Sequence, residues 1–330
     1  MAKMASKREK VKDVFPILSL DGGGSLGFYT LGFLRQVEQL LGTPLCEKFR
    51  LIYGTSTGAI IAALLADGRS VDDVFEIYKN HIPAIMGQNK AKGRTTGLKQ
   101  CAKEVFKDMD YSTLKTNVGI VAVRCDSNRP LIFKNNIDFA FGGKGTFKPG
   151  FDVPLADAVI GSCSAHPYFE KHRVCLKSEG APEEIDIIDG GFVANDPSLF
   201  AIVDAVCARK VPRNQVKVLS ISTGDFVSPK TGPIGALIDK AKDIVSEKGL
   251  GFDRNLMDIV MKANANNLSF LRSVSFPEVE CVRVHEVSND RNLTTHFLEE
   301  NLEKLLQIRQ AGYNRFSSFE FEIKELLRIK

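Results

Sequence analysis

The chain has 330 residues, of which 44% are hydrophobic and 25% charged, and its formal net charge is +4. This composition is typical of a globular protein with a sizeable core, and so mild a positive charge does not predict a nucleic-acid partner. The seven cysteines are scattered and include no Cys-x-x-Cys pair, which predicts reduced thiols in a cytoplasmic protein and excludes a disulfide framework. No apolar run approaches the length of a membrane-spanning helix.

The first thirteen residues form a polar, basic arm that lacks the apolar centre of a signal peptide. We predict a flexible terminus there, with peripheral contact to anionic lipid as the alternative. From residue 14 onward there is no internal repeat and no linker composition, so a single α/β domain is predicted over 14–330. Within it, 14–230 is the expected catalytic core, and 231–330 is an expected helical portion packed on that core.

The first elements alternate between strand and helix. A strand is predicted at 14–20, then a glycine loop at 21–27 and a helix at 28–41, where leucines recur at helical spacing. A second short strand, 51–53, runs into Gly-Thr-Ser-Thr-Gly at 54–58 and an apolar helix. This alternation predicts strands that lie side by side in a largely parallel sheet.

The later elements are a helix from residue 71, a long loop, further strands and a helical end. The segment 83–100 is polar, basic and rich in glycine, which predicts a loop of the kind that often covers a site. Apolar runs predict strands at 118–123, 130–133, 185–188 and 216–222, and helical spacing predicts helices at 157–160, 234–245, 255–262 and 293–308.

The pattern Gly-x-Ser-x-Gly after a strand and before a helix is typical of a nucleophile elbow. Such a turn lifts the hydroxyl of Ser56 out of the sheet, and it needs glycine at Gly54 and Gly58 because side chains there would collide with the strand and the helix. The helix N-terminus also favours negative charge that develops near the serine. Ser56 is therefore the candidate nucleophile.

The glycine loop allows two interpretations. Gly22, Gly24 and Gly27 satisfy the Gly-x-Gly-x-x-Gly pattern of a dinucleotide site, but the acidic residue expected at the end of the next strand is missing. The adjacent Gly22, Gly23 and Gly24 instead suit an oxyanion hole, where bare N–H groups approach a substrate oxygen. We favour the oxyanion hole and keep a nicotinamide site as the alternative.

A serine hydroxyl needs a base within hydrogen-bonding reach. Among the five histidines, His81, His166, His172, His285 and His296, the chain order Ser–Asp–His of an α/β-hydrolase would allow His285 or His296. The other candidate is Asp189, which follows the strand at 185–188 and precedes two glycines that let a substrate come close. Burial would raise the pKa of such a carboxylate and make it a better base.

Together these segments resemble the patatin-like phospholipases. The resemblance implies a three-layer α/β/α fold with a central, mostly parallel sheet, and a catalytic dyad of Ser56 and Asp189 without histidine. It also implies an oxyanion hole at the glycine loop, where the family usually has Arg or Lys and this chain has Leu26. The matching segments are Asp21–Gly24, Gly54–Gly58, Ser162–Phe169, Asp189–Gly191, Ala194–Pro197 and Ser220–Gly224.

Three further segments, 27–32, 78–83 and 129–134, resemble a bacterial subgroup, the patatin-like effectors of cyclic-oligonucleotide anti-phage signalling (CBASS). This resemblance implies membrane phospholipids as the substrate, a cyclic oligonucleotide as the activator, and a cytoplasmic protein that acts at the inner face of the cell membrane. The candidate surface for the anionic activator is the basic segment with Lys90, Lys92, Arg94 and Lys99.

Two alternatives of function remain: a constitutive lipid acyl hydrolase, and a lipid- or nucleotide-binding module that has lost catalysis. No cofactor and no metal are implied, because no cluster of His, Cys and carboxylates has ligand spacing. The oligomeric state is left open, a homo-oligomer included.

Overall fold

The computed structural model describes residues 14–107, 109–140, 147–177, 181–226, 254–288, 290 and 292–329. The predicted N-terminal arm, 1–13, and the predicted helix at 234–245 lie outside the described residues. Within them, no helix combines the length and the apolar character that a membrane crossing requires.

An eight-stranded sheet forms the centre of the molecule, with the strand order β5-β6-β3-β2-β1-β7-β9 and with β4 paired to β3. The strands β3, β2, β1, β7 and β9 pair with one another in parallel in this order. The pairs β3–β4, β3–β6 and β5–β6 are antiparallel, so the sheet is mixed and mostly parallel. The strands are β1 (Phe15–Leu20), β2 (Leu51–Thr55), β3 (Asn117–Arg124), β4 (Arg129–Lys134), β5 (His172–Leu176), β6 (Glu183–Asp189), β7 (Val216–Ile221) and β9 (Glu280–Val284). A separate parallel pair joins β8 (Asp225–Phe226) to β10 (Val287–Ser288).

Alternate residues of the central strands enter two hydrophobic cores, one on each face of the sheet. On β1, Leu18 and Leu20 belong to one core and Ile17 to the other, as the period of two in a strand requires. The first core is covered by α1 (Gly27–Leu41), α2 (Leu45–Lys48), α3 (Thr57–Asp67), α4 (Val71–Met86), α5 (Ala91–Val105), α6 (Leu155–Ser162), α11 (Leu302–Arg315) and α12 (Glu320–Leu327).

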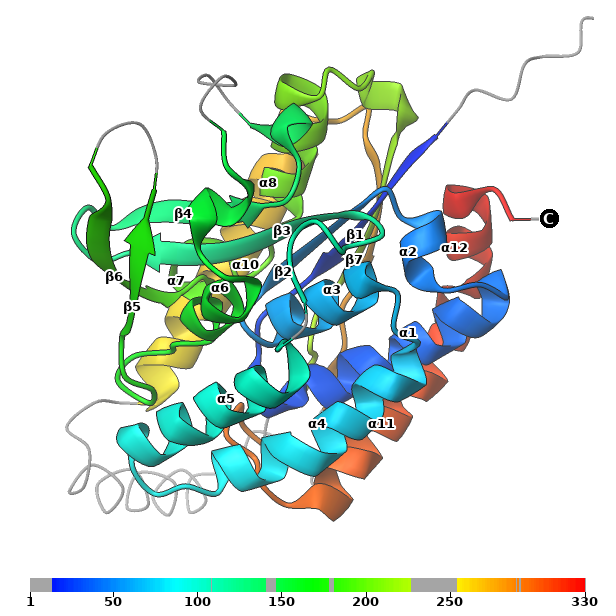
Figure 1. The fold of residues 1–330 in the computed structure, drawn as a ribbon. Helices are drawn as coiled ribbons and strands as arrows, with labels where there is room; N and C mark the ends of the chain where they lie inside the picture. Colours follow the sequence, from blue (N-terminus) through cyan, green and yellow to red (C-terminus); the bar gives the residue numbers. More distant parts are fainter. Residues whose placement is uncertain are drawn as a thin grey trace, which may run out of the picture.

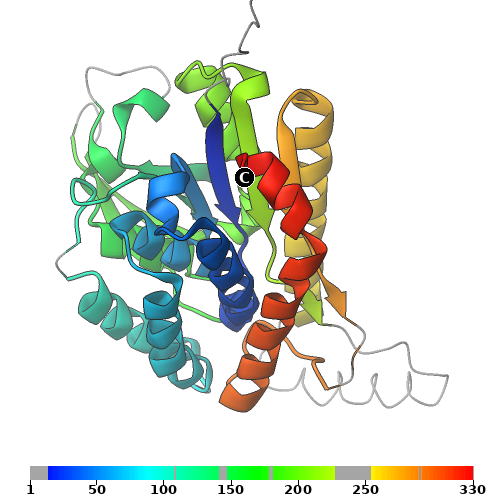
Figure 2. The same cartoon turned by 90° about the vertical axis from the view of Figure 1, so that its right-hand side faces the viewer.

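The opposite face is covered by α7 (Gly191–Ala194) and α8 (Ser198–Val203), against which α10 (Arg254–Ser275) packs. In Figure 1 the sheet runs between α3 and α6 in front and α8 and α10 behind. Figure 2 shows α10, in yellow to light orange, across β1 from the cyan helices α4 and α5. The predicted three-layer α/β/α architecture is therefore confirmed.

The prediction of a loop at 83–100 is wrong, because two helices cover most of this segment. Helix α4 continues to Met86 with Pro83 inside it, and α5 begins at Ala91, so only four residues connect the two helices. The buried face of α5 contains the polar residues Arg94 and Thr95 beside Leu98. These polar residues interrupt the apolar periodicity by which a buried helix is recognised in a sequence.

The helical end also differs from its prediction. Strand β9 lies within it and pairs in parallel with β7, which extends the sheet. The helix predicted at 293–308 begins only at Leu302, where the side chain of Asn301 caps it by accepting a hydrogen bond from the N–H of Lys304 at 3.1 Å. The carbonyl of Phe297 instead accepts a hydrogen bond from the N–H of Ser25 at 2.9 Å, so this segment braces the glycine loop.

Candidate active site

Ser56 stands on a strained turn between β2 and α3. Its φ is 53° and its ψ is −123°, a conformation that a non-glycine residue adopts only where the surroundings enforce it. A Cβ on Gly54 would lie 2.2 Å from the carbonyl oxygen of Gly58, and one on Gly58 would lie 2.3 Å from the carbonyl oxygen of Leu20. The tight elbow therefore requires both glycines. Ser162 holds it from the other side, because its Oγ accepts a hydrogen bond from the N–H of Ser56 at 2.9 Å.

The register of the sheet brings Asp189 to this elbow. Thr55 pairs with Val121 of β3, and the next residue of β3, Ala122, pairs with Asp189 of β6. Only one strand, β3, thus lies between the strands that carry the carboxylate and the serine, although the two residues are 133 positions apart in the chain. Asp189 lies near Ser56 because β3 pairs with β2 in parallel on one side and with β6 antiparallel on the other.

The carboxyl group of Asp189 is buried, with 1% of the residue exposed. Its Oδ1 accepts a hydrogen bond from the N–H of Gly191 at 2.7 Å, and its Oδ2 accepts none from any described residue. Burial raises its pKa to about 7, although the nearby Ser56 hydroxyl and the N–H of Gly191 act in the opposite direction. Ser56 therefore lies close enough to influence the carboxylate without a hydrogen bond of standard geometry, which is common at unliganded catalytic sites.

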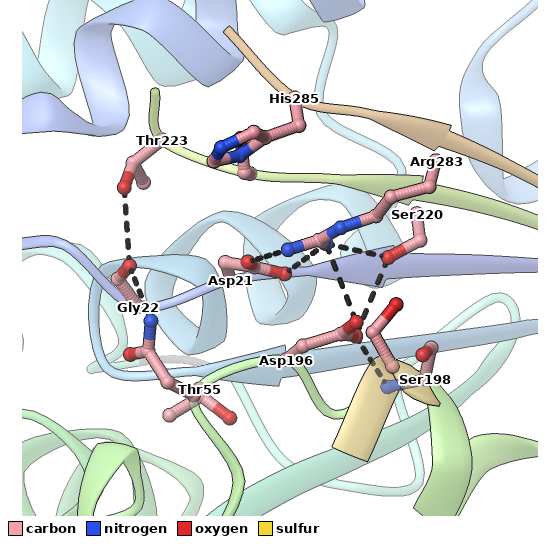
Figure 3. A network of polar contacts seen from close by, with 12 residues as sticks. Asp21, Gly22, Thr55, Asp196, Ser198, Ser220, Thr223, Arg283 and His285 are labelled. Carbon is pink, nitrogen blue, oxygen red and sulfur yellow. Dashed lines mark hydrogen bonds and ion pairs between the residues drawn. The ribbon is translucent and has the colours of Figure 1, made fainter. Parts of the chain in front are cut away.

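The glycine loop lies against the serine. A Cβ on Gly22 would lie 2.4 Å from Oδ1 of Asn195 and 3.2 Å from Cβ of Ser56, so a side chain at this position would crowd both neighbours. The N–H of Gly22 already donates to the carbonyl of Asn195 at 3.1 Å, and its carbonyl accepts from Oγ1 of Thr223 at 3.2 Å (Figure 3). No described residue accepts a hydrogen bond from the N–H groups of Gly23 and Gly24. These two groups are therefore available to a ligand.

Ser56, Asp189 and the glycine loop share one cavity of about 340 Å³. The lining has a mostly apolar part from α3, α4, α5 and the segment after α6, which we call the apolar wall. A more polar part, the polar wall, comes from α10, the ends of β7 and β9 and residues 294–297. The apolar wall includes Ile60, Ile82, Ile85, Met86, Leu98 and Phe169. Such a cavity suits a molecule with an acyl chain and a polar end.

The family model for patatin-like phospholipases matches residues 18–202 of this chain. A cUMP-AMP-activated phospholipase of Escherichia coli is 40% identical over 94% of this chain and 93% of its own length. The chain belongs to the patatin-like phospholipase family. A cGAMP-activated phospholipase of Vibrio cholerae is 27% identical over 65% of this chain and 66% of its own length. VipD of Legionella pneumophila has the same fold, with a TM-score of 0.50 and 12% identity over 97% of this chain and 72% of that protein.

The predicted phospholipase is thus confirmed at the level of the family, and the nicotinamide site loses its support. The patatin-like fold also places the candidate histidines. His285 meets Oγ of Ser222 through Nδ1 at 3.2 Å and Asp225 through Nε2 at 3.5 Å, and Nδ1 of His296 accepts from the N–H of Leu298. Both ring nitrogens of His285 and Nδ1 of His296 thus meet partners other than Ser56, so Asp189 is the better candidate base.

A buried ionic network behind the glycine loop was missed in the sequence (Figure 3). Arg283 of β9 donates to both carboxylate oxygens of Asp21, at 2.7 and 2.5 Å, and to Oγ of Ser220 at 2.7 Å. It also lies 3.5 Å from Asp196. Asp21 directly precedes Gly22, so Arg283 fixes the start of the loop. The short run Glu-Cys-Val-Arg-Val, with two β-branched valines, was the signal for a strand there.

The two carboxylates of this network differ in their pKa values. Burial raises the pKa of Asp21 to about 7, against the lowering effect of Arg283. Burial also raises the pKa of Asp196, but the charges of Arg283 and Arg272 outweigh it and leave that pKa below its ordinary value. Two buried acids therefore share the charge of Arg283, and the charge of Asp196 is the better compensated.

The predicted basic residues divide into two groups. Arg94 is buried and donates from Nε to the carbonyl of Tyr168 at 2.8 Å and from a terminal nitrogen to the carbonyl of Gln88, so its guanidinium joins α5 to the segment after α6. Arg94 therefore lies inside the fold, whereas the sequence had suggested that it is part of an exposed basic surface. Lys90, Lys92 and Lys99 are exposed at or along α5.

Proposed function

We propose that this chain is a cytoplasmic phospholipase that cleaves acyl esters of membrane phospholipids with Ser56 and Asp189. We further propose that a cyclic oligonucleotide switches it on during anti-phage defence. The observation that carries the catalytic part is the strained elbow serine beside a buried carboxylate whose Oδ2 has no described partner. The relatives described as activated by cUMP-AMP or cGAMP support the nucleotide switch.

The proposed reaction has two steps. Oγ of Ser56 attacks the ester carbonyl carbon while its proton passes to Asp189, and the N–H groups of Gly23 and Gly24 donate to the oxyanion. Asp189 returns the proton to the departing lysophospholipid oxygen, which leaves an acyl-enzyme. Asp189 then takes a proton from water, the hydroxide attacks the acyl carbon, and the proton returns to Ser56 as the fatty acid departs.

Release of fatty acid from bacterial phospholipid vesicles, measured with and without a panel of cyclic di- and trinucleotides, tests this function. We expect hydrolysis that depends on one nucleotide. Hydrolysis without any nucleotide would leave a constitutive lipase and contradict the switch. Silence with every nucleotide, together with no labelling of Ser56 by a fluorophosphonate, would favour the binding module.

The pH dependence of hydrolysis should report Asp189. Its carboxylate accepts a proton only when ionised, and burial raises its pKa to about 7. We therefore expect kcat/KM on a soluble p-nitrophenyl ester to rise about tenfold per pH unit below 7 and to level off above it. A plateau that extends down to pH 5 would contradict a buried carboxylate base.

The exposed lysines of α5 are our candidates for the activator. Lys92, Lys99 and Lys103 are separated by seven and four residues, so they lie on the same side of the helix. We expect Lys99→Glu with Lys103→Glu to raise the nucleotide concentration for half-activation by about tenfold or more, since two attractive charges become repulsive. Fluorophosphonate labelling of Ser56 without nucleotide should be unchanged. An unchanged activation curve would exclude this surface.

A further inference from the structure

The polar wall of the cavity contains a cluster of charged side chains that the dyad and the glycine loop do not use. Lys262 of α10 lies 2.7 Å from Asp258 of the same helix and 3.0 Å from Asp225 at the start of β8. His285 at the end of β9 lies 3.5 Å from the other oxygen of Asp225. All four residues line the same cavity as Ser56.

The ion pairs within this cluster leave hydrogen-bond donors and acceptors that a ligand in the cavity can use. The side chain of Asp258 is 48% exposed and that of Lys262 is 37% exposed, so both can meet a ligand in the cavity. An ammonium has three donors, and the two aspartates account for two of those of Lys262. Each carboxylate likewise keeps unused acceptor positions.

The charge of the cluster is unbalanced toward the negative. Two aspartates oppose one lysine, and burial lowers the pKa of His285, which favours the neutral ring. Within this cluster, a ligand with a single negative charge would therefore meet one cation and two anions. A zwitterion offers a partner to both signs: its cation to the carboxylates, and its anion to Lys262 and His285.

We propose that this cluster is the subsite for the headgroup of the substrate, and that it selects zwitterionic phospholipids. The ammonium of an ethanolamine headgroup contacts Asp258, the more exposed carboxylate, and the phosphate contacts Lys262. The acyl chain then lies along the apolar wall of α4 and α5, which places the ester between the two walls, at Ser56. This inference rests on the phospholipid substrate of the proposed function.

Binding to the Ser56→Ala protein tests the subsite without hydrolysis. Calorimetric titration would compare short-chain phosphatidylethanolamine with phosphatidylglycerol of the same acyl chains, below their micellar concentrations. We expect the ethanolamine lipid to bind about two- to fivefold more tightly, the range for one partly exposed charge pair. Adding Asp258→Asn should remove the difference, because the carboxamide has almost the same shape but no charge.

Glu322→Gln on α12 is the matched control. This carboxylate is exposed and lies outside the cavity lining, so its loss should leave the preference intact. Equal binding of the two lipids, or a preference that persists in Asp258→Asn, would overturn the subsite.

Hydrolysis of mixed vesicles in the presence of cUMP-AMP gives a second measurement. The ratio of lysophosphatidylethanolamine to lysophosphatidylglycerol should fall two- to fivefold in Asp258→Asn and stay unchanged in Glu322→Gln. A chain that hydrolyses neither lipid would contradict the proposed function, while the binding comparison still decides the subsite. Hydrolysis with an unchanged ratio would contradict the subsite alone.

Discussion

Ser56→Ala and Asp189→Asn should each lower phospholipid hydrolysis by on the order of 10⁴-fold or more, as loss of a nucleophile or its base does in serine hydrolases. Ser56→Ala removes the attacking oxygen, and Asp189→Asn keeps the shape of the side chain but cannot accept the serine proton. The measurement is fatty-acid release from vesicles at saturating nucleotide. Ser112→Ala and Glu322→Gln, both exposed and outside the cavity lining, are the matched controls and should retain full activity.

The stability of Asp189→Asn separates lost chemistry from lost folding. The pKa of Asp189 is about 7 in the folded chain and 3.8 as its ordinary value, so between these pH values the unfolded chain releases a proton that the folded chain keeps. The group therefore lowers the free energy of unfolding as pH rises from 3.8 to about 7, and the loss is complete above that.

Asp189→Asn removes the decrease in the free energy of unfolding that ionisation of the buried carboxyl group causes. At pH 8 we expect its free energy of unfolding to exceed that of the wild type by on the order of 2–4 kcal/mol, with no gain at pH 4. Denaturant titration at the two pH values measures it. An inactive variant that is also less stable at pH 8 would show that Asp189 supports the fold instead of carrying the reaction.

Arg283→Met should be the most destabilising single change in the network behind the glycine loop. It leaves Asp21 and Asp196 buried without their shared cation, and breaking a buried ion pair from one side costs about 3–5 kcal/mol. The loop also loses its anchor, so residual folded protein should label poorly at Ser56. Denaturant unfolding and fluorophosphonate labelling, read on the same samples, measure the two effects.

Two comparisons identify the cause of the loss in Arg283→Met. Adding Asp21→Asn should restore part of the stability, because the buried charge goes with its partner. Lowering the pH from 8 to 5 should narrow the gap to the wild type, since Asp21 without Arg283 is protonated at the lower pH. A cost that stays the same in the double variant and at both pH values would point to lost packing of the arginine stem instead.

Local sequence patterns were sufficient to predict those parts of the site in which the backbone geometry requires glycine. The elbow around Ser56 was predictable because Gly54 and Gly58 fill positions that no side chain can occupy. The glycine loop was predictable for a similar reason, although the engaged N–H of Gly22 was not, because Asn195 reaches it from a distant part of the chain. Helix α5 was mistaken for a loop because Arg94 and Thr95 are buried through contacts that only the folded chain provides.

By itself, the sequence determined the alternation of strands and helices, the elbow, the bare glycine loop and hence the family, since each depends on residues that are neighbours in the chain. The tertiary structure decided what depends on partners far apart. It placed Asp189 beside Ser56 through the register of three strands, and it delivered Arg283 to Asp21 from a strand hidden in an apparently helical region. It also gathered Asp225, Lys262 and His285 on one cavity wall. Spacing in the sequence does not predict these contacts between distant residues, because they depend on the order of the strands and on the direction in which the strands pair.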